Sequence, residues 1–258
     1  MAIMHSDFGA RVEPRTGAKT AWRTLRGASH RRPSIVPGLL IFAAVNDALP
    51  SLRGRLHQHT IWFSLAAAVL LIVFAPAGTP RLTAAIYGIG LNALFITSAV
   101  YHRWPPTSRW KPVLRRVDHC VIFVFIAASY TPIAALILEP PSSTIVLVSV
   151  WGGALLGVAF SVAWIDAPRL AVALAYIGVG WVIVIALPEI LDEVGLAPTL
   201  LFLGGGLLYS AGAVVYARKR PDPWPRVYGF HEVFHTLVIG AALLHFVAMA
   251  GWVIPAAT

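Results

Sequence analysis

The chain has 258 residues, of which 58% are hydrophobic and only 12% are charged, and its formal net charge is +9. Soluble domains carry about 25% charged residues, so this balance excludes an ordinary soluble protein and favours a membrane protein. The single cysteine, Cys120, excludes an internal disulfide framework.

The chain begins with a basic segment that contains few apolar runs. Residues 1–35 lack the apolar core of a signal peptide, so we expect a disordered cytoplasmic arm. The next stretch, GLLIFAAVNDAL at 38–49, is too short to cross a bilayer and ends at Pro50. It is typical of a short helix at the membrane interface, which together with its linker occupies 36–55.

The rest of the chain, 56–254, contains seven long apolar stretches. A spanning helix needs about 20 mostly apolar residues, and these stretches are apolar all round, which argues against a soluble helical bundle. We therefore predict an all-α integral membrane protein, a seven-transmembrane helix bundle. Its spans lie near 56–76, 80–102, 118–138, 143–165, 168–188, 196–217 and 231–254.

Proline and glycine residues have ordinary explanations inside these spans. Pro188 is expected to kink or end the fifth span. The run Gly204-Gly205-Gly206 in the sixth span is expected to permit the close approach of another helix.

Lysine and arginine residues predict how the bundle is oriented. In a seven-span arrangement all 20 of them except Arg81 fall on one side of the membrane. Cytoplasmic loops are the ones enriched in these residues, so we predict a cytoplasmic N-terminus and an outside C-terminus in the plasma (inner) membrane. The net positive charge then mainly reflects how the bundle is oriented in the membrane. It also gives the protein some affinity for anionic lipid headgroups. Nucleic-acid binding is not expected, because no basic soluble domain is left to carry it.

Polar residues at membrane depth converge on the predicted cytoplasmic end. Ser98 and His102 lie four residues apart where the second span ends, and Asp118 lies where the third span begins. His231 and His235 are one helical turn apart at the start of the seventh span. Ionisable groups inside spans are functional candidates by default, and these come to one depth from three helices.

These residues match the needs of a catalytic zinc site. Neutral imidazole is the commonest zinc ligand, and a catalytic site keeps three protein ligands and a water. We predict His102, His231 and His235 as ligands of Zn²⁺. Asp118 and Ser98 would orient the water or a ligand imidazole as catalytic groups, and Asp118 could also bind the metal directly.

Each polar residue also has a structural interpretation. A histidine at a span end is often an interfacial side chain or a hydrogen-bond partner between helices. We assign that interpretation to His57, His59, His119 and His245. Asp118 taken alone could pair with Arg115 or Arg116.

The sequence His231-Glu232-x-x-His235 has the spacing of a metalloprotease motif. In such an enzyme the glutamate is the general base, and a third ligand lies further along the chain. No Asp or Glu follows His235. The protease hypothesis is therefore weaker than a site completed by His102, with Glu232 as a charge at the helix start or a group behind the ligands.

Several segments, taken together and in order, resemble a known family. They are LPSLRGRLHQHT, SAVYHRW, RRVDHCVIFVFIAASYTPIAAL and HEVFHTLVIGAALLHF. They resemble the hemolysin III family, the bacterial branch of the progestin and adipoQ receptor superfamily, over about residues 35 to 254. The resemblance implies seven helices, a cytoplasmic N-terminus, and zinc near the cytoplasmic face. Carried over, the zinc ligands are His102, His231 and His235, with Asp118 and Ser98 around the zinc-bound water.

Three functions are compatible with these residues. The first is a zinc-dependent hydrolase of a membrane lipid amide, with Asp118 as general base; relatives in the superfamily are associated with ceramide hydrolysis, so the substrate class comes from the resemblance alone. The second is a non-enzymatic sensor or regulator of membrane state with structural zinc. The third is a cytolysin, the role that the family label suggests. Membrane lipids are the expected partners, and the sequence leaves the oligomeric state open.

Overall fold

The computed structural model describes residues 50–105 and 107–257, which belong to one compact unit, Phe42–Thr258. Within these residues the chain is helical and contains no strand. The predicted disordered arm, 1–35, and the predicted interfacial helix, 38–49, lie outside the described residues.

Six of the described helices are long and apolar enough to cross a bilayer, and a bent pair makes up to seven spans when it is counted as one. The six are α2 (Arg55–Phe74), α3 (Thr79–Arg103), α4 (Lys111–Leu136), α5 (Ser142–Ala163), α8 (Leu196–Arg218) and α9 (Phe230–Ala248), which a π-helical turn (Met249–Val253) extends. The bent pair is α6 (Arg169–Gly180), with its 3-10 turn η1 (Trp181–Ile185), and α7 (Leu187–Val194). The predicted fold class, an all-α membrane protein, is confirmed.

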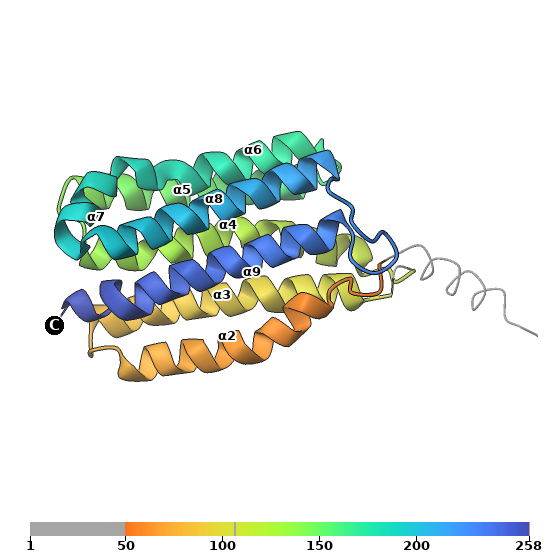
Figure 1. The fold of residues 1–258 in the computed structure, drawn as a ribbon. Helices are drawn as coiled ribbons and strands as arrows, with labels where there is room; N and C mark the ends of the chain where they lie inside the picture. The colour runs from red at the N-terminus through yellow and green to blue at the C-terminus, as the bar shows by residue number, and fades with distance from the viewer. Residues whose placement is uncertain (1–49, 106, 258) are drawn as a thin grey trace, which may run out of the picture. The chain divides into compact units, whose positions relative to one another are not determined.

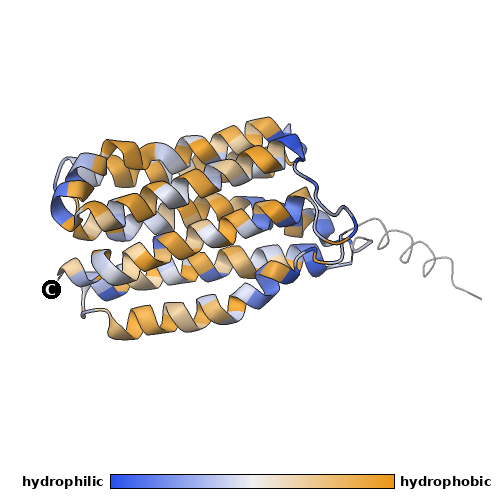
Figure 2. Ribbon diagram, viewed as in Figure 1, coloured by the Kyte–Doolittle hydropathy of each residue, from blue (hydrophilic) through white to orange (hydrophobic). Residues whose placement is uncertain are grey.

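The helices lie roughly alongside one another, with α8 beside α9, α3 beside α4, and α2 packed on α3 at the edge of the bundle (Figure 1). Most of the apolar windows of α3 and α4 are buried, 61% and 56%, against 22% for α2 and for α8. Helices α3 and α4 therefore form the centre of the bundle. The outer helices turn apolar side chains outward, and hydrophilic residues gather near the helix ends (Figure 2).

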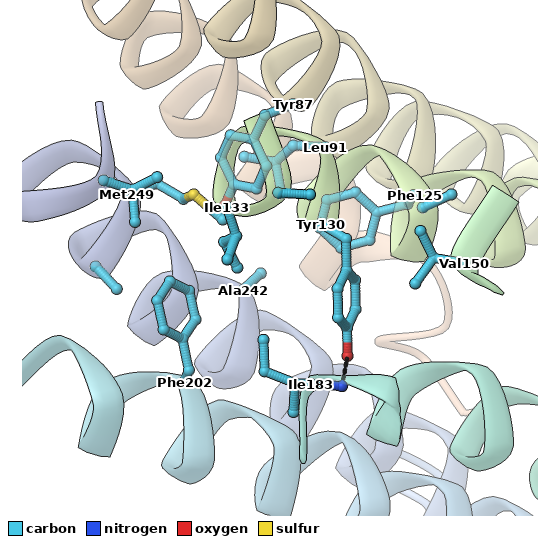
Figure 3. Packing of buried hydrophobic residues seen from close by; sticks show 14 of the residues in the cluster. Tyr87, Leu91, Phe125, Tyr130, Ile133, Val150, Ile183, Phe202, Ala242 and Met249 are labelled. Atoms are coloured by element: carbon cyan, nitrogen blue, oxygen red, sulfur yellow. Dashed lines mark hydrogen bonds between the residues drawn. The ribbon is translucent and has the colours of Figure 1, made fainter. Parts of the chain in front are cut away.

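The fifth span is broken in the middle. Helix α6 passes into η1, and α7 follows at an angle of 53°. Backbone groups freed by such a break need partners inside the protein, because lipid offers none. The Tyr130 hydroxyl accepts a hydrogen bond from Ile183 N (2.9 Å) and donates one to Gly180 O (2.5 Å) (Figure 3). The expected kink at Pro188 is confirmed, because Pro188 lies in the first turn of α7 directly after the bend, but the span continues past it to Val194.

The third spanning helix also differs from the prediction, because α4 begins at Lys111 and not near 118. Pro112 lies in its first turn, where proline favours helix initiation. Asp118 is consequently placed two turns inside the helix, at the depth where α3 and α9 surround it.

One end of the bundle carries nearly all of the positive charge in the described residues. At this end, called the basic end below, α3 and α8 finish while α2, α4, α6 and α9 begin. Of the described lysines and arginines, only Arg81 lies at the opposite end, in the first turn of α3. The predicted segregation of charge therefore exists in space, while the orientation of the bundle across the membrane stays a prediction.

The contact between α8 and α9 depends on Gly205. A Cβ at this position would overlap the imidazole of His245 on α9, whereas a Cβ at Gly206 would meet only Trp181 Cζ2 at 3.9 Å. The His245 ring is fixed there, because its Nε2 donates a hydrogen bond to Phe202 O at 3.1 Å. The expectation that the glycine run permits close helix approach is thus realised at Gly205.

We predict that Gly205→Ala destabilises the protein, because overpacking a close helix contact costs about 1–3 kcal/mol. The measurement is the thermal unfolding midpoint of the purified protein in detergent. Gly206→Ala is the matched control and should leave the midpoint nearly unchanged. Equal midpoints for the two variants would contradict this account of the α8–α9 contact.

We also predict that the two sides of α9 lie in different compartments. Arg220 precedes α9 at the basic end, and Thr258 follows it at the far end of the chain. Reporter fusions after these residues should report the cytoplasm and the outside, respectively, because basic loops stay inside. The same compartment for both fusions is incompatible with the seven-span arrangement.

Candidate metal centre

Three histidines from two helices meet at the basic end. His102 lies in the last turn of α3, and His231 and His235 lie in the first two turns of α9. One ring nitrogen from each can be chosen so that all three lie within 4.8 Å of one another. The shortest separation, between His102 Nε2 and His231 Nε2, is 3.0 Å. The structure therefore brings together the three side chains that the sequence singles out.

The unpartnered ring nitrogen of His235 indicates that the three histidines are suited to bind a metal ion. His235 is only 3% exposed, and its Nε2 has no hydrogen-bond partner among the described residues. A buried nitrogen without a partner is unfavourable, and such atoms are rare in folded proteins. Zinc binds imidazole nitrogen at about 2.0–2.1 Å, which places tetrahedral ligand nitrogens about 3.3 Å apart. The donor set and its spacing fit a divalent metal of this kind.

His57, at the start of α2, lies directly behind this cluster. His235 Nδ1 is 2.8 Å from His57 Nε2 and 2.9 Å from His57 Nδ1. His57 is buried, packs edge-on against Phe95, and is only 2% exposed. Because Nδ1 of His235 is engaged in this way, its unpartnered Nε2 is the ring nitrogen left free to bind a metal.

The sequence interpretation placed His57 among the helix–helix hydrogen-bond partners and did not connect it with the site. His57 and His59 are two residues apart in the same polar turn, and spacing alone does not separate them. Only the packing distinguishes the two, since His57 is buried while His59 is exposed.

Gly54 brings the start of α2 close to His102. Its φ of 75° is a left-handed conformation that glycine adopts without strain. A Cβ at this position would lie 2.7 Å from His102 Cβ, which is closer than real Cβ atoms approach. Glycine at this position therefore allows α2 to begin against the last turn of α3.

Glu232, the acidic residue of the protease-like motif, is already engaged on both oxygens. Its Oε1 accepts from Arg53 Nε at 2.7 Å, and its Oε2 accepts from the backbone N–H of Gly229 at 2.9 Å. The side chain is 1% exposed and acts as a helix cap and ion-pair partner. This arrangement disfavours Glu232 as the general base of a protease.

Asp118 and Ser98 line the same small cavity as the histidines. The cavity is about 50 Å³, and both residues are buried. Ser98 comes from α3 and Asp118 from α4, so two helices bring a hydroxyl group and a carboxyl group to the same cavity. The alternative pairing of Asp118 with a neighbouring arginine is not realised, because Arg115 binds Asp166 (2.8 Å) and Arg116 contacts backbone carbonyls. Asp118 is thus a buried carboxylate without an ion-pair partner among the described residues.

The other partly buried histidines of the described bundle lie outside the cluster. His245 is held by Phe202 O, nearly three turns further along α9 than His235. His119 neighbours Asp118 on α4 and lines the small cavity, and its backbone carbonyl accepts a hydrogen bond from the Tyr176 hydroxyl. Neither belongs to the group of residues whose ring nitrogens converge.

A second, largely apolar cavity of about 120 Å³ adjoins the first. The two cavities share several lining residues, among them Leu94, Ile122 and Phe234. The second cavity extends along the bundle towards Phe202 and Met249, which belong to the buried core (Figure 3). A polar site at one end of the bundle therefore lies next to an apolar cavity suited to a hydrocarbon chain.

Comparisons with known proteins cover the residues of this site. A family model described as "Haemolysin-III related" matches residues 47–246. The chain is 28% identical over 200 residues to Hemolysin-3 of Bacillus cereus, covering 76% of this chain and 87% of the relative. It is 30% identical over 197 residues to the Hemolysin-3 homolog of Bacillus subtilis (strain 168), covering 74% and 87%. It is also 30% identical over 177 residues to the monocyte to macrophage differentiation factor of Homo sapiens, covering 66% and 69%.

Proposed function

The chain belongs to the haemolysin-III-related family, and we propose that it is a zinc-dependent hydrolase of an amide bond in a membrane lipid. One observation carries the proposal: His235, with an unpartnered Nε2, belongs to a cluster of three histidines whose ring nitrogens lie within 4.8 Å of one another, beside a buried carboxylate, Asp118. Three imidazole groups with a carboxylate beside them suit a bound metal ion with a neighbouring group that accepts a proton. As a membrane protein of this family, the chain would contribute to membrane homeostasis.

His102, His231 and His235 would hold the metal, and His57 would keep the ring of His235 in place. A ligand histidine commonly engages its second ring nitrogen with a neighbouring group, which fixes the tautomer and the ring orientation. The contact between His57 and His235 Nδ1 has this form. When bound, zinc would polarise a carbonyl and lower the pKa of water into the neutral range.

Asp118 would act as the general base. It is buried in the same cavity as the three histidines and has no ion-pair partner among the described residues, so its carboxylate is available to take a proton. Ser98 would keep that carboxylate in position through its hydroxyl group. The adjoining apolar cavity would hold the acyl chain, with the amide carbonyl at the small cavity.

A second candidate function is a sensor of membrane state with structural zinc. The cluster joins the end of α3 to the start of α9, and the small cavity of about 50 Å³ leaves little room beside it. A metal at this position would hold the two spans together without catalysing a reaction. Hydrolase and sensor require the same ligands and differ in what Asp118 does.

We predict one zinc ion per chain in the purified protein, measured by inductively coupled plasma mass spectrometry. His235→Ala removes a ligand and should reduce the zinc content to near background. His245→Ala is the matched control, because this buried histidine lies about 15 Å along the same helix axis. Equal zinc loss in both variants would show that the ligand set is wrong.

We predict that Asp118→Asn lowers the rate of lipid amide hydrolysis roughly 10²–10⁴-fold, because asparagine keeps the shape of the side chain but cannot take a proton. The zinc content should barely change. Asp166→Asn is the control, since this exposed carboxylate pairs with Arg115 at the same end of the bundle. Unchanged hydrolysis and zinc in Asp118→Asn would exclude the general base and favour the sensor.

A further inference from the structure

Arg169 lies beside the histidine cluster, where three helices meet at the basic end. It is the first residue of α6, and its guanidinium lies over the rings of Tyr216 on α8 (5.4 Å) and Phe230 on α9 (5.5 Å). Both rings border the site, because Phe230 precedes His231 and Tyr216 lines the small cavity. One turn along α6, Val172 and Ala173 line that cavity too.

The guanidinium has an unused hydrogen-bond donor. Nη1 of Arg169 is buried and has no hydrogen-bond partner among the described residues. Aromatic faces attract the cation, but they accept no conventional hydrogen bond from it. A buried charged donor without an acceptor is unfavourable, so an anionic group from outside the chain would be stabilising at this position.

None of the carboxylates described at this end of the bundle forms an ion pair with Arg169. Glu232 binds Arg53, Asp166 binds Arg115, Asp222 accepts from the backbone N–H of Phe230, and Asp118 lines the small cavity. The surrounding basic residues leave the basic end with a net positive charge, which attracts anionic lipid headgroups. Arg169 therefore has no ion-pair partner among the described residues.

We propose that Arg169 binds the phosphate group of an anionic membrane phospholipid. A guanidinium presents two parallel donors that match phosphate oxygens, and two aromatic rings hold it in one orientation. Arg169 begins a spanning segment, so it lies at headgroup depth, and the adjacent Leu170 is 61% exposed on the lipid-facing surface. A lipid can thus present its phosphate to Arg169 while its chains remain in the bilayer. This binding needs neither zinc nor hydrolysis and goes beyond the proposed function.

The test measures which lipids the purified full-length protein retains. The protein is reconstituted in phosphatidylcholine nanodiscs that contain a minor fraction of phosphatidic acid. It is then released from the nanodiscs, and the lipids that stay bound to it are counted by native mass spectrometry. The wild-type protein should retain phosphatidic acid in preference to phosphatidylcholine. Equal retention of the two lipids by the wild-type protein overturns the proposal, whatever the variants do.

Arg169→Gln should lower the ratio of bound phosphatidic acid to phosphatidylcholine about tenfold or more, because it removes a charge-assisted bidentate contact. Arg218→Gln is the matched control, since Arg218 is an exposed arginine at the same end of the bundle. Arg169→Lys keeps the positive charge but loses the paired N–H donors of the guanidinium, so it should give an intermediate ratio. An Arg169→Gln ratio equal to that of Arg218→Gln contradicts the proposal.

Two competitors distinguish the sources of the anion. Excess inorganic phosphate should leave phosphatidic acid bound, and displacement by it would overturn the assignment to a lipid. Excess oleate should also leave phosphatidic acid bound, and displacement by oleate would overturn the assignment to a phosphate group in favour of a carboxylate.

Discussion

The 3.0 Å approach of His102 Nε2 to His231 Nε2 fixes the geometry of the basic end. It requires the last turn of α3 and the first turn of α9 to meet face to face. Gly54 permits α2 to begin against His102, and the Arg53–Glu232 ion pair holds that start of α2 to α9. The ring of His57 then reaches His235. Each of these contacts depends on the two helix ends being brought together.

Most buried polar groups elsewhere in the described bundle find partners within the protein, as an apolar surrounding demands. Asn92 donates to Gly88 O (2.9 Å) and accepts from Ser64 (2.9 Å), and the Trp181 indole donates to Ser210 (2.9 Å). Against this background, the free Nε2 of His235 next to two other imidazoles is an exception. The same reasoning applies to Arg169, whose Nη1 is also buried without a partner among the described residues. The hydroxyls of Tyr87 and Tyr209 are also buried without a partner in the described part of the chain, but the two nitrogens, on His235 and Arg169, both lie at the basic end.

Much of the fold and part of the candidate site could be predicted from sequence, because a bilayer imposes length and hydropathy on each span. The depth of His102, His231 and His235 followed from counting residues into those spans. Pro188 predicted a kink or end in the fifth span, but the 3-10 turn before it could not be predicted, since its backbone groups depend on the hydroxyl of Tyr130 from another helix. His57 was missed for a related reason: its contact with His235 joins residues 178 apart in the chain, and its own turn is locally unremarkable in composition.

The central claim, that three imidazoles bind one zinc ion, is tested most directly by zinc K-edge X-ray absorption spectroscopy on the purified protein. The account predicts scattering from three imidazole nitrogens at about 2.0–2.1 Å and one oxygen ligand, without a sulfur shell. A sulfur shell would place the metal on Cys120, which lies outside the cluster. A first shell of oxygen alone, without imidazole scattering, would contradict the account.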